Sequence, residues 1–261
     1  MTTRQMSRPL AAVAAASVVF VVLPLVGLAV RMPWSDAWSL LASAPTRQAA
    51  WVSFSTSVTA ALISLLFGVP LAWWMARSRS RVVGAVRSVV ITPMVMPPVV
   101  AGIALLTVFG RRGVVGQWLH EWWGISIPFT RTAVVMAQVL VAMPFLVVAV
   151  ESAFRQLDTG LEDAARTLGA SPWVVFSRIA LPGVRGAVGA GAALAWARSL
   201  GEFGASITFA GSFPGRTQTL PMSVYELVST DYRLSLVLSF VMMAVAVAVI
   251  AALRGRWVVA R

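Results

Sequence analysis

The sequence predicts an all-α protein that crosses a membrane six times, and three observations support this fold class. First, 59% of the 261 residues are hydrophobic, 11% are charged and the mean hydropathy is +0.83, whereas an ordinary soluble domain carries about 25% charged residues. Second, six apolar runs approach the roughly 20 residues that a membrane-spanning helix needs. Third, the arginines lie mostly in the gaps between these runs. The chain is therefore expected to be a polytopic membrane protein with six transmembrane helices.

The six predicted transmembrane helices are bounded by charged residues. They cover residues 10–30, 51–76, 89–109, 132–150, 187–210 and 234–253. Pro93, Pro97 and Pro98 fall inside the third run and predict a broken or kinked helix there. The first run is longer than the apolar region of a secretory signal peptide, and no convincing small-residue cleavage site follows it. A retained helix is therefore favoured over a signal peptide.

This pattern divides the chain into three parts. Residues 1–50 hold the N-terminal transmembrane helix and an outer loop. Residues 51–253 form a transmembrane domain of five helices, which includes the loop between the fourth and fifth runs. Residues 254–261 form a basic tail.

The residue types that are missing from the chain exclude several kinds of chemistry. All 21 basic residues are arginine, so the chain has no lysine; it also has no cysteine and a single histidine, His120. Without cysteine there is no disulfide, zinc–cysteine site, iron–sulfur cluster or thiol nucleophile. Without lysine there is no Walker A loop, so the chain is not itself a P-loop ATPase. We expect no cofactor and no metal site in this chain.

The placement of the arginines predicts the orientation of the helices. With the amino terminus in the cytoplasm, thirteen arginines lie on the cytoplasmic side, namely Arg4, Arg8, Arg77, Arg79, Arg81, Arg87, Arg155, Arg166, Arg178, Arg185, Arg254, Arg256 and Arg261. Seven lie outside, namely Arg31, Arg47, Arg111, Arg112, Arg131, Arg216 and Arg233. The positive-inside rule then places both termini in the cytoplasm. It also explains the net charge of +12 without nucleic acid as a partner.

The loop between the fourth and fifth runs, at about 155–185, is expected to form two short helices. Thr159 followed by Glu162 is a capping box, in which the two side chains accept hydrogen bonds from the orphan N–H groups of the first turn. Gly169 is expected to end this first helix in the left-handed conformation. The helix carries a small apolar face made of Leu161, Ala164, Ala165 and Leu168.

The second helix of the loop starts with Ser171 as N-cap and Pro172 at the first helical position. Pro182 is expected to end it. Its apolar face is made of Trp173, Phe176 and Ala180. Two interpretations of the helix pair stay open from periodicity alone: a pair that lies on lipid headgroups, or a docking site for a soluble partner.

The loop resembles the EAA motif of the permease subunits of ABC importers, which docks into a groove on an ATPase subunit. The resemblance is carried by Glu-Asp-Ala-Ala at 162–165, by Gly169 and by the closing Leu-Pro at 181–182, and it extends over roughly 51–253. It implies the type I ABC importer permease fold. The ATPase-coupling residues that it implies are Glu162, Asp163, Ala164, Ala165, Gly169, Ser171, Pro172, Ile179, Leu181 and Pro182.

The resemblance also implies the partners and the location of the chain. It implies a homodimer of twelve helices in the cell membrane, bound by two cytoplasmic ATPase subunits and by an extracytoplasmic oxyanion-binding protein. ATP and magnesium would bind to the ATPase subunits. The chain itself would be a transport subunit that lies in lipid, and not an enzyme.

Three further stretches resemble the permeases of molybdate and related oxyanion importers. They are TPMVMPPVVAG at 92–102, ARSLGEFGA at 197–205 and FAGSFPGRTQTLP at 209–221. Sulfate and thiosulfate permeases share features of the first two, whereas the third favours molybdate; sulfate, thiosulfate and tungstate stay alternative cargoes. A membrane-embedded hydrolase, the enzyme alternative, would need a polar catalytic cluster at membrane depth, and the sequence shows none beyond Arg198 and Glu202.

Several residues are candidates for the translocation path or its gate. Arg198 and Glu202 are spaced i and i+4 in the fifth run, where an unpaired charge costs at least about 2.5–3.5 kcal/mol. They are expected either to form an intrahelical ion pair or to face the path, where Arg198 would attract a dianion. The other candidates are Pro97, Pro98, Gly201 and Gly204, of which the glycines would allow close helix approach.

Two clusters are predicted on the outer side. Arg216, Thr217, Gln218 and Thr219 form either a donor-rich contact for an oxyanion or its carrier protein, or an ordinary solvated loop. Trp118, Trp122 and Trp123 surround His120. This aromatic neighbourhood is typical of the belt of residues that anchors a protein at the membrane interface.

Overall fold

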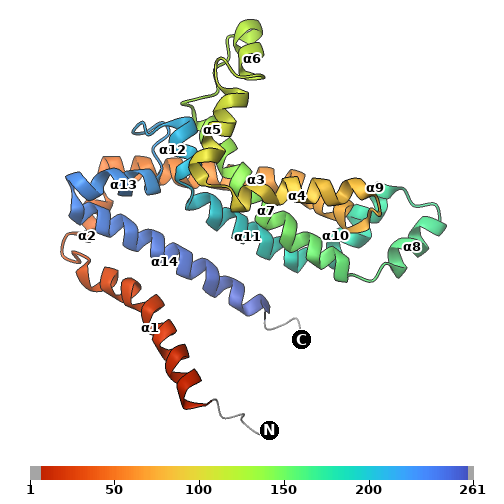
Figure 1. The fold of residues 1–261 in the computed structure, drawn as a ribbon, viewed down its shortest axis with the longest axis horizontal. Coiled ribbons are helices and arrows are strands. Elements are labelled where there is room, and N and C mark those ends of the chain that lie inside the picture. Colours follow the sequence, from red (N-terminus) through yellow and green to blue (C-terminus); the bar gives the residue numbers. More distant parts are fainter. Residues whose placement is uncertain (1–6, 258–261) are drawn as a thin grey trace.

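The computed structural model describes residues 7–257, and within this range all regular secondary structure is helical (Figure 1). The helices are α1 (Arg8–Arg31), α2 (Ala37–Leu41), α3 (Ala44–Arg77), α4 (Arg81–Val95), α5 (Pro98–Phe109), α6 (Gly116–Trp123), α7 (Arg131–Gln156), α8 (Gly160–Thr167), α9 (Pro172–Val175), a π-helical turn (Phe176–Ala180), α10 (Leu181–Gly183), α11 (Arg185–Leu200), α12 (Gly204–Ala210), α13 (Leu220–Thr230) and α14 (Tyr232–Trp257). The predicted all-α fold class is confirmed.

Four helices are long and apolar enough to cross a membrane as single spans, namely α1, α3, α7 and α14. Two bent stretches pass the same test when each is counted as one span. One joins α4 to α5, and the other joins the stretch Pro172–Gly183 to α11. The described residues thus hold four to six membrane spans, which agrees with a polytopic membrane protein.

The centre of the bundle is the packing of α7 against α3 and α11 (Figure 1). Small residues along α3 let the neighbouring helices approach closely; a Cβ atom on Gly68 would lie 3.0 Å from a methyl carbon of Leu146 in α7. The indole N–H of Trp196 in α11 donates to the hydroxyl oxygen of Ser57, 3.1 Å away. The fully buried face of α3 includes Ser53, Ser57, Ala60, Ser64, Ala72 and Met75.

Successive helices of the bundle alternate in direction, and this defines two ends. At the first, called the α8 end, α3 and α7 finish, α11 begins, and α8 lies beyond them (Figure 1). The opposite end, called the α13 end, holds α12 and α13. There, Arg131 at the start of α7 donates from Nη2 to the carbonyl oxygen of Gly215, 2.8 Å away. Helices that cross a membrane one after another must alternate in direction, so this arrangement agrees with the six predicted spans.

The first helix stands apart from the rest of the bundle. None of the residues in the apolar window of α1 is buried, and its neighbour in the fold is α14 (Figure 1). The hydrophobic core therefore forms without α1.

The third predicted span is broken, the first of the two predicted alternatives, and consists of two helices bent by 120°. α4 begins at Arg81, earlier than predicted, and ends at Val95. Met96 and Pro97 then adopt extended backbone conformations, with ψ of 135° and 132°. The cause is the Pro97–Pro98 pair, because each proline disfavours the helical conformation for the residue before it and removes an N–H donor.

The start of the second span differs from its predicted boundary. α3 begins at Ala44 with Pro45 in its first turn, a position where a missing N–H costs no hydrogen bond. Residues 44–50, which the prediction assigned to an outer loop, are therefore helical. The apolar pattern missed them because Gln48 and Arg47 interrupt it.

The last helix also passes its predicted boundary. α14 continues to Trp257, so the first part of the predicted basic tail, with Arg254 and Arg256, is helical. Arg4 and residues 258–261, which include Arg261, lie outside the described residues.

Two glycines allow α5 and α12 to cross at very short range. A Cβ atom on Gly102 would lie 2.6 Å from the Cβ atom of Thr208 and 2.8 Å from the carbonyl oxygen of Ala205. A Cβ atom on Gly204 would lie 2.6 Å from the Cβ atom of Pro98. Real Cβ atoms do not approach other atoms so closely, so this crossing requires glycine. The first residue of α5 consequently touches the first residue of α12.

We expect Gly102→Ala to destabilise the fold, because the new methyl group would displace the backbone of α12. Gly84→Ala in α4 is the matched control, since a Cβ atom there meets nothing within 4 Å and alanine stabilises a helix interior by roughly 0.5–1 kcal/mol relative to glycine. Thermal unfolding of both purified variants checks this contrast. A lower Tm for Gly102→Ala and an equal or higher Tm for Gly84→Ala are expected, and an unchanged Tm for Gly102→Ala contradicts the tight crossing.

Candidate functional site

The carboxylate of Glu162 in α8 is fully buried at the α8 end and is bound by two arginines. Arg77, the last residue of α3, donates to Oε1 from Nη2 at 2.7 Å and from Nε at 3.0 Å. Arg166, one turn further along α8, donates from Nη2 to Oε2 at 3.0 Å. A buried carboxylate is tolerated only when it is paired and hydrogen-bonded. The side chain of Glu162 therefore fixes α8 to the end of α3.

The predicted capping box at the start of α8 is wrong. Thr159 is the N-cap residue, but its side chain accepts no hydrogen bond, and Glu162 turns to Arg77 rather than to the helix start. The side chain of Asp158 replaces the box, since its Oδ1 accepts the N–H of Gly160 at 3.0 Å. The guanidinium of Arg77 offers Glu162 a charge-assisted pair, which is stronger than a neutral backbone donor.

The predicted ends of the two helices in this loop are confirmed at Gly169 and Ser171. Gly169 has φ of +83°, in the left-handed region. Its N–H donates to the carbonyl oxygen of Arg166, and the N–H of Ala170 donates to that of Ala165, both at 3.0 Å. These two bonds form a Schellman motif. Ser171 then caps the next helix by accepting the N–H of Val174 at 3.4 Å.

Pro182 does not end the second helix, contrary to the prediction. The chain passes through a π-helical turn at Phe176–Ala180, in which the N–H of Leu181 bonds to the carbonyl oxygen of Phe176, and continues to Gly183. The wider turn tolerates the missing N–H group of Pro182, so the helix does not end at this proline. The chain then bends by 79° into α11, so the elbow lies one residue after the predicted stop.

The segment from α8 to α10, which we call the coupling segment (160–183), has one packed face and one exposed apolar face. Val175 and Ala180 are fully buried, and Phe176 packs between Trp73 of α3 and Trp173. Three large apolar side chains of this segment are exposed: Leu161 is 72% exposed, Leu168 88% and Trp173 70%. Of the other predicted loop residues, Asp163, Ala164, Pro172 and Pro182 are exposed, whereas Ala165, Ile179 and Leu181 are partly buried.

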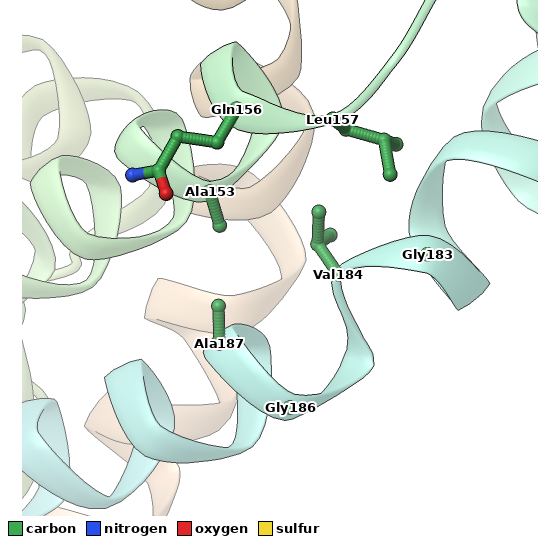
Figure 2. A pocket seen from close by; sticks show the side chains of 7 residues that line it. All are labelled: Ala153, Gln156, Leu157, Gly183, Val184, Gly186 and Ala187. Carbon is green, nitrogen blue, oxygen red and sulfur yellow. The ribbon is translucent and has the colours of Figure 1, made fainter. Parts of the chain in front are cut away.

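An open cavity of about 310 Å³ lies behind the elbow, between the last turn of α7 and the first turn of α11 (Figure 2). Its lining consists of Ala153, Gln156, Leu157, Gly183, Val184, Gly186 and Ala187. None of these residues is charged, and Gln156 carries the one polar side chain among them. Its small residues leave space beside the joint between α10 and α11.

The charged pair of the fifth run lies at a helix break and not in the middle of a helix. Arg198 Nη1 and Glu202 Oε2 are 2.7 Å apart, so the predicted i, i+4 ion pair is present. Glu202 follows the end of α11, and its Oε1 accepts the N–H of Ala205 at 2.8 Å in the first turn of α12. Glu202 is almost fully buried, whereas the side chain of Arg198 is 29% exposed. The carboxylate therefore pairs with Arg198 and also accepts a backbone N–H that has no partner within the helix, because the helix is broken there.

The two candidate glycines beside this break behave differently. Gly204 makes the close approach to Pro98 described above, within the same chain. A Cβ atom on Gly201 would meet only the carbonyl oxygen of Ala197, at 3.7 Å, so no close approach depends on Gly201. The break between α4 and α5 therefore meets the break between α11 and α12, which divide the predicted spans 89–109 and 187–210 and are called the two broken spans below. Pro97, Pro98, Glu202 and Gly204 lie at this meeting point.

The outer-loop cluster is mostly buried rather than open. Thr217 donates from its hydroxyl to the carbonyl oxygen of Gly211 and accepts the N–H of Phe213, both at 3.0 Å. Gln218 donates from Nε2 to Glu226 at 2.7 Å, and Thr219 is fully buried. Arg216 alone of the four is exposed. Thr217, Gln218 and Thr219 thus belong to the packed structure of the loop. Of the four residues, Arg216 is the one whose side chain is exposed to a ligand.

The aromatic residues near His120 lie on α6, which projects from the bundle (Figure 1). Trp118 and Trp122 stack with ring centroids 6.0 Å apart, and both are exposed, as is Trp123. The nearest polar partner of His120 is Arg111, whose Nε donates to its Nε2 at 3.0 Å. A hydrolytic triad needs a carboxylate beside the histidine, so the pair of His120 and Arg111 does not form one. The described residues also hold no cluster of histidine and carboxylates that fits a metal ion.

A third buried carboxylate, Glu151 in α7, was not among the residues that the sequence predicted. It is bound by Arg155, with 2.9 Å between Nε and Oε1, and by Arg87 of α4. Arg155 also donates from Nη2 to the carbonyl oxygen of Met75 at 3.2 Å. The available signal was a carboxylate directly after the apolar run 132–150 with an arginine four residues later.

The comparison with protein families gives a match along most of the chain. Residues 68–261 match the family described as "Binding-protein-dependent transport system inner membrane component". The molybdenum transport system permease protein ModB of Mycobacterium tuberculosis is 44% identical over 243 residues, which cover 93% of this chain and 92% of that protein. ModB of Escherichia coli is 40% identical over 213 residues, covering 82% and 93%.

Two solved structures share the fold at low sequence identity. A chain of a bacterial ABC transporter involved in the import of the acidic polysaccharide alginate has a TM-score of 0.70 at 20% identity and covers 97% of this chain and 96% of its own. A chain of the MetNI methionine ABC transporter has a TM-score of 0.57 at 17% identity, covering 82% and 99%. The fold is thus that of the permeases of type I ABC importers.

We expect Glu162→Gln to release α8 from α3. Removing one partner of a buried ion pair costs about 3–5 kcal/mol, so hydrogen exchange of the α8 amides should accelerate by roughly 100-fold or more. Asp163→Asn is the matched control, because Asp163 pairs with Arg166 on the surface and such pairs contribute about 0–1 kcal/mol. Equal exchange rates of α8 in the two variants contradict the anchoring role of Glu162.

Proposed function

Since the chain belongs to the family of inner membrane components of binding-protein-dependent transport systems, we propose that it is the permease subunit of an ATP-driven molybdate importer. The observation that carries this proposal is the similarity to molybdenum transport permeases over nearly the whole chain. A permease subunit is a transport component and not an enzyme. ATP and magnesium bind to a separate ATPase chain, in keeping with the lack of lysine for a Walker A loop.

In this proposal the coupling segment is the contact with the ATPase subunit. Its exposed side chains Leu161, Leu168 and Trp173 are the apolar surface that a groove on the ATPase would bury. The buried pair of Glu162 and Arg77 joins this segment to α3. A displacement of α8 by the ATPase would consequently move the end of a transmembrane helix and not a loose loop.

The path for the oxyanion runs, in this proposal, past the meeting point of the two broken spans. Arg198 supplies positive charge, and its partly exposed side chain is held in place by Glu202. A dianion at membrane depth needs such a cation, because an unpaired charge there is costly. The contact of Pro98 with Gly204 would open or close as α5 and α12 move.

The orientation and the partners follow from the same assignment. We place the α8 end and both termini in the cytoplasm, since thirteen arginines lie on that side of the predicted helices and seven on the other. The α13 end, with the exposed Arg216, then faces the extracytoplasmic oxyanion-binding protein. The permease is a homodimer in this proposal, and the exposed tryptophans of α6 lie at the lipid interface.

Gly169→Val should weaken the coupling between cargo and ATP hydrolysis. A β-branched residue with φ of +83° costs about 1–2 kcal/mol, which corresponds to a factor of roughly 5–30 in an equilibrium. We expect the ATP hydrolysis that cargo-loaded binding protein stimulates to fall by about that factor in the reconstituted complex. Gly186→Val is the control, since Gly186 has no positive φ and no atom within 4 Å of a Cβ. Normal stimulation in Gly169→Val contradicts the coupling role.

The proposed cargo is tested by uptake in a strain that lacks the gene, grown with trace molybdate and a large excess of sulfate. Cellular molybdenum should fall and return when the gene is restored, while sulfate uptake stays unchanged. Sulfate, tungstate and molybdate are all tetrahedral dianions, so tungstate uptake is measured beside them. A fall in sulfate uptake identifies a sulfate permease instead, and no change in any of the three overturns the oxyanion assignment.

A further inference from the structure

The buried carboxylate of Glu151 joins three helices at the α8 end. Its own helix, α7, supplies Arg155 as one partner, and α4 supplies Arg87 as the other. Arg155 in turn reaches the carbonyl oxygen of Met75 near the end of α3. Glu151 is 5% exposed, so its charge is shielded from water and depends on these two arginines. This cluster lies outside the coupling segment (160–183).

The pair of Arg87 and Glu151 is the main polar attachment of α4 to the bundle. Of the fifteen residues of α4, Val83 alone is buried. Val86 and Val90 are partly buried and pack against the hydrophobic core, whereas Val82, Val89 and Val95 are exposed. One face of α4 thus makes apolar contacts with the core, and the charged pair adds the directional contact that fixes Arg87 of α4 against Glu151 of α7.

α4 is also the helix that leads to the meeting point of the broken spans. It ends at Val95, and after Met96 and Pro97 the chain enters α5, whose first residue touches Gly204 of α12. Glu202, which caps α12, lies just before that glycine. The position of α4 therefore sets where the Pro98–Gly204 contact begins.

We propose that Arg87 and Glu151 are positioning residues of the transport cycle: their pair makes α4 move with α7, so that motion at the α8 end reaches the contact of Pro98 with Gly204. This inference rests on the proposed function and adds a connection that the coupling segment alone does not supply. Arg77 and Glu162 bind α8 to α3, and Glu151 binds α4 to α7 and α3. The bend at Met96–Pro97 is then the joint at which α5 turns relative to α4.

A role in stability alone predicts a different outcome. Buried ion pairs are weak evidence for stability, and their loss as purely structural elements would lower the amount and the Tm of the complex. It would leave the number of molybdate ions imported per ATP hydrolysed unchanged. The transport ratio therefore distinguishes positioning from stability.

The first experiment measures this ratio for the complete complex of permease, ATPase and molybdate-loaded binding protein in proteoliposomes. Arg87→Gln should lower the ratio by about tenfold, within the range of a typical coupling free energy. Arg87→Lys keeps the charge but not the forked geometry and should restore most of the ratio. Arg81→Gln is the matched control, an exposed arginine on the same helix for which the described residues show no ion pair; its ratio should equal that of the wild type.

The second experiment starts from a chain with the wild-type Arg87 and Glu151, so its first arm does not depend on the folding of a variant of this pair. The chain has no cysteine, so single cysteines at the exposed positions Thr92 in α4 and Ser152 in α7 take spin labels without background from this chain. The distance distribution between the labels should stay narrow and unchanged when ATP is added to the assembled complex. The same distribution should broaden in Arg87→Gln.

The outcomes separate this inference from the proposed function. If the wild-type complex imports no molybdate, the proposed function fails. If it does, a normal ratio in Arg87→Gln overturns the positioning role, and so does a shift of the Thr92–Ser152 distance on addition of ATP to the wild type. A low ratio with restoration by lysine and a constant distance supports it.

Discussion

Two buried carboxylates organise the α8 end of this protein. Glu162 and Glu151 are each bound by two arginines, one from the same helix and one from a distant helix. A carboxylate in a low-dielectric site is tolerated only beside a cation. Arg77 places the end of α3 beside Glu162, and Arg87 places α4 beside Glu151. The arrangement of the helices at this end follows from that constraint.

The second constraint is the cost of unpaired backbone groups at membrane depth. Both broken spans interrupt helical hydrogen bonding, and each uses a different means to tolerate it. Pro97 and Pro98 carry no N–H group, so the break before α5 has fewer donors to satisfy. The break before α12 instead uses the carboxylate of Glu202, which accepts the N–H of Ala205. The contact between Pro98 and Gly204 then joins the two breaks into one structural unit.

Local signals in the sequence predicted the features that depend on neighbouring residues. The proline break at 97–98, the left-handed Gly169 and the Ser171 cap depend on backbone preferences within one or two turns, and all three are present. The capping box failed because Glu162 has a stronger partner in Arg77, 85 residues earlier in the chain. Glu151 was missed for the same reason, since its partner Arg87 is 64 residues away. One sequence does not reveal such pairings, because spacing carries no information about contacts between distant helices.

Every ion pair in the described part of the chain has arginine as its cation, and the whole sequence has no lysine. Lysine is the residue whose charge a cell removes by acetylation. The clusters around Glu151 and Glu162 therefore offer such enzymes no substrate. Their charge balance is inherited with the gene and is not adjusted after synthesis by this modification.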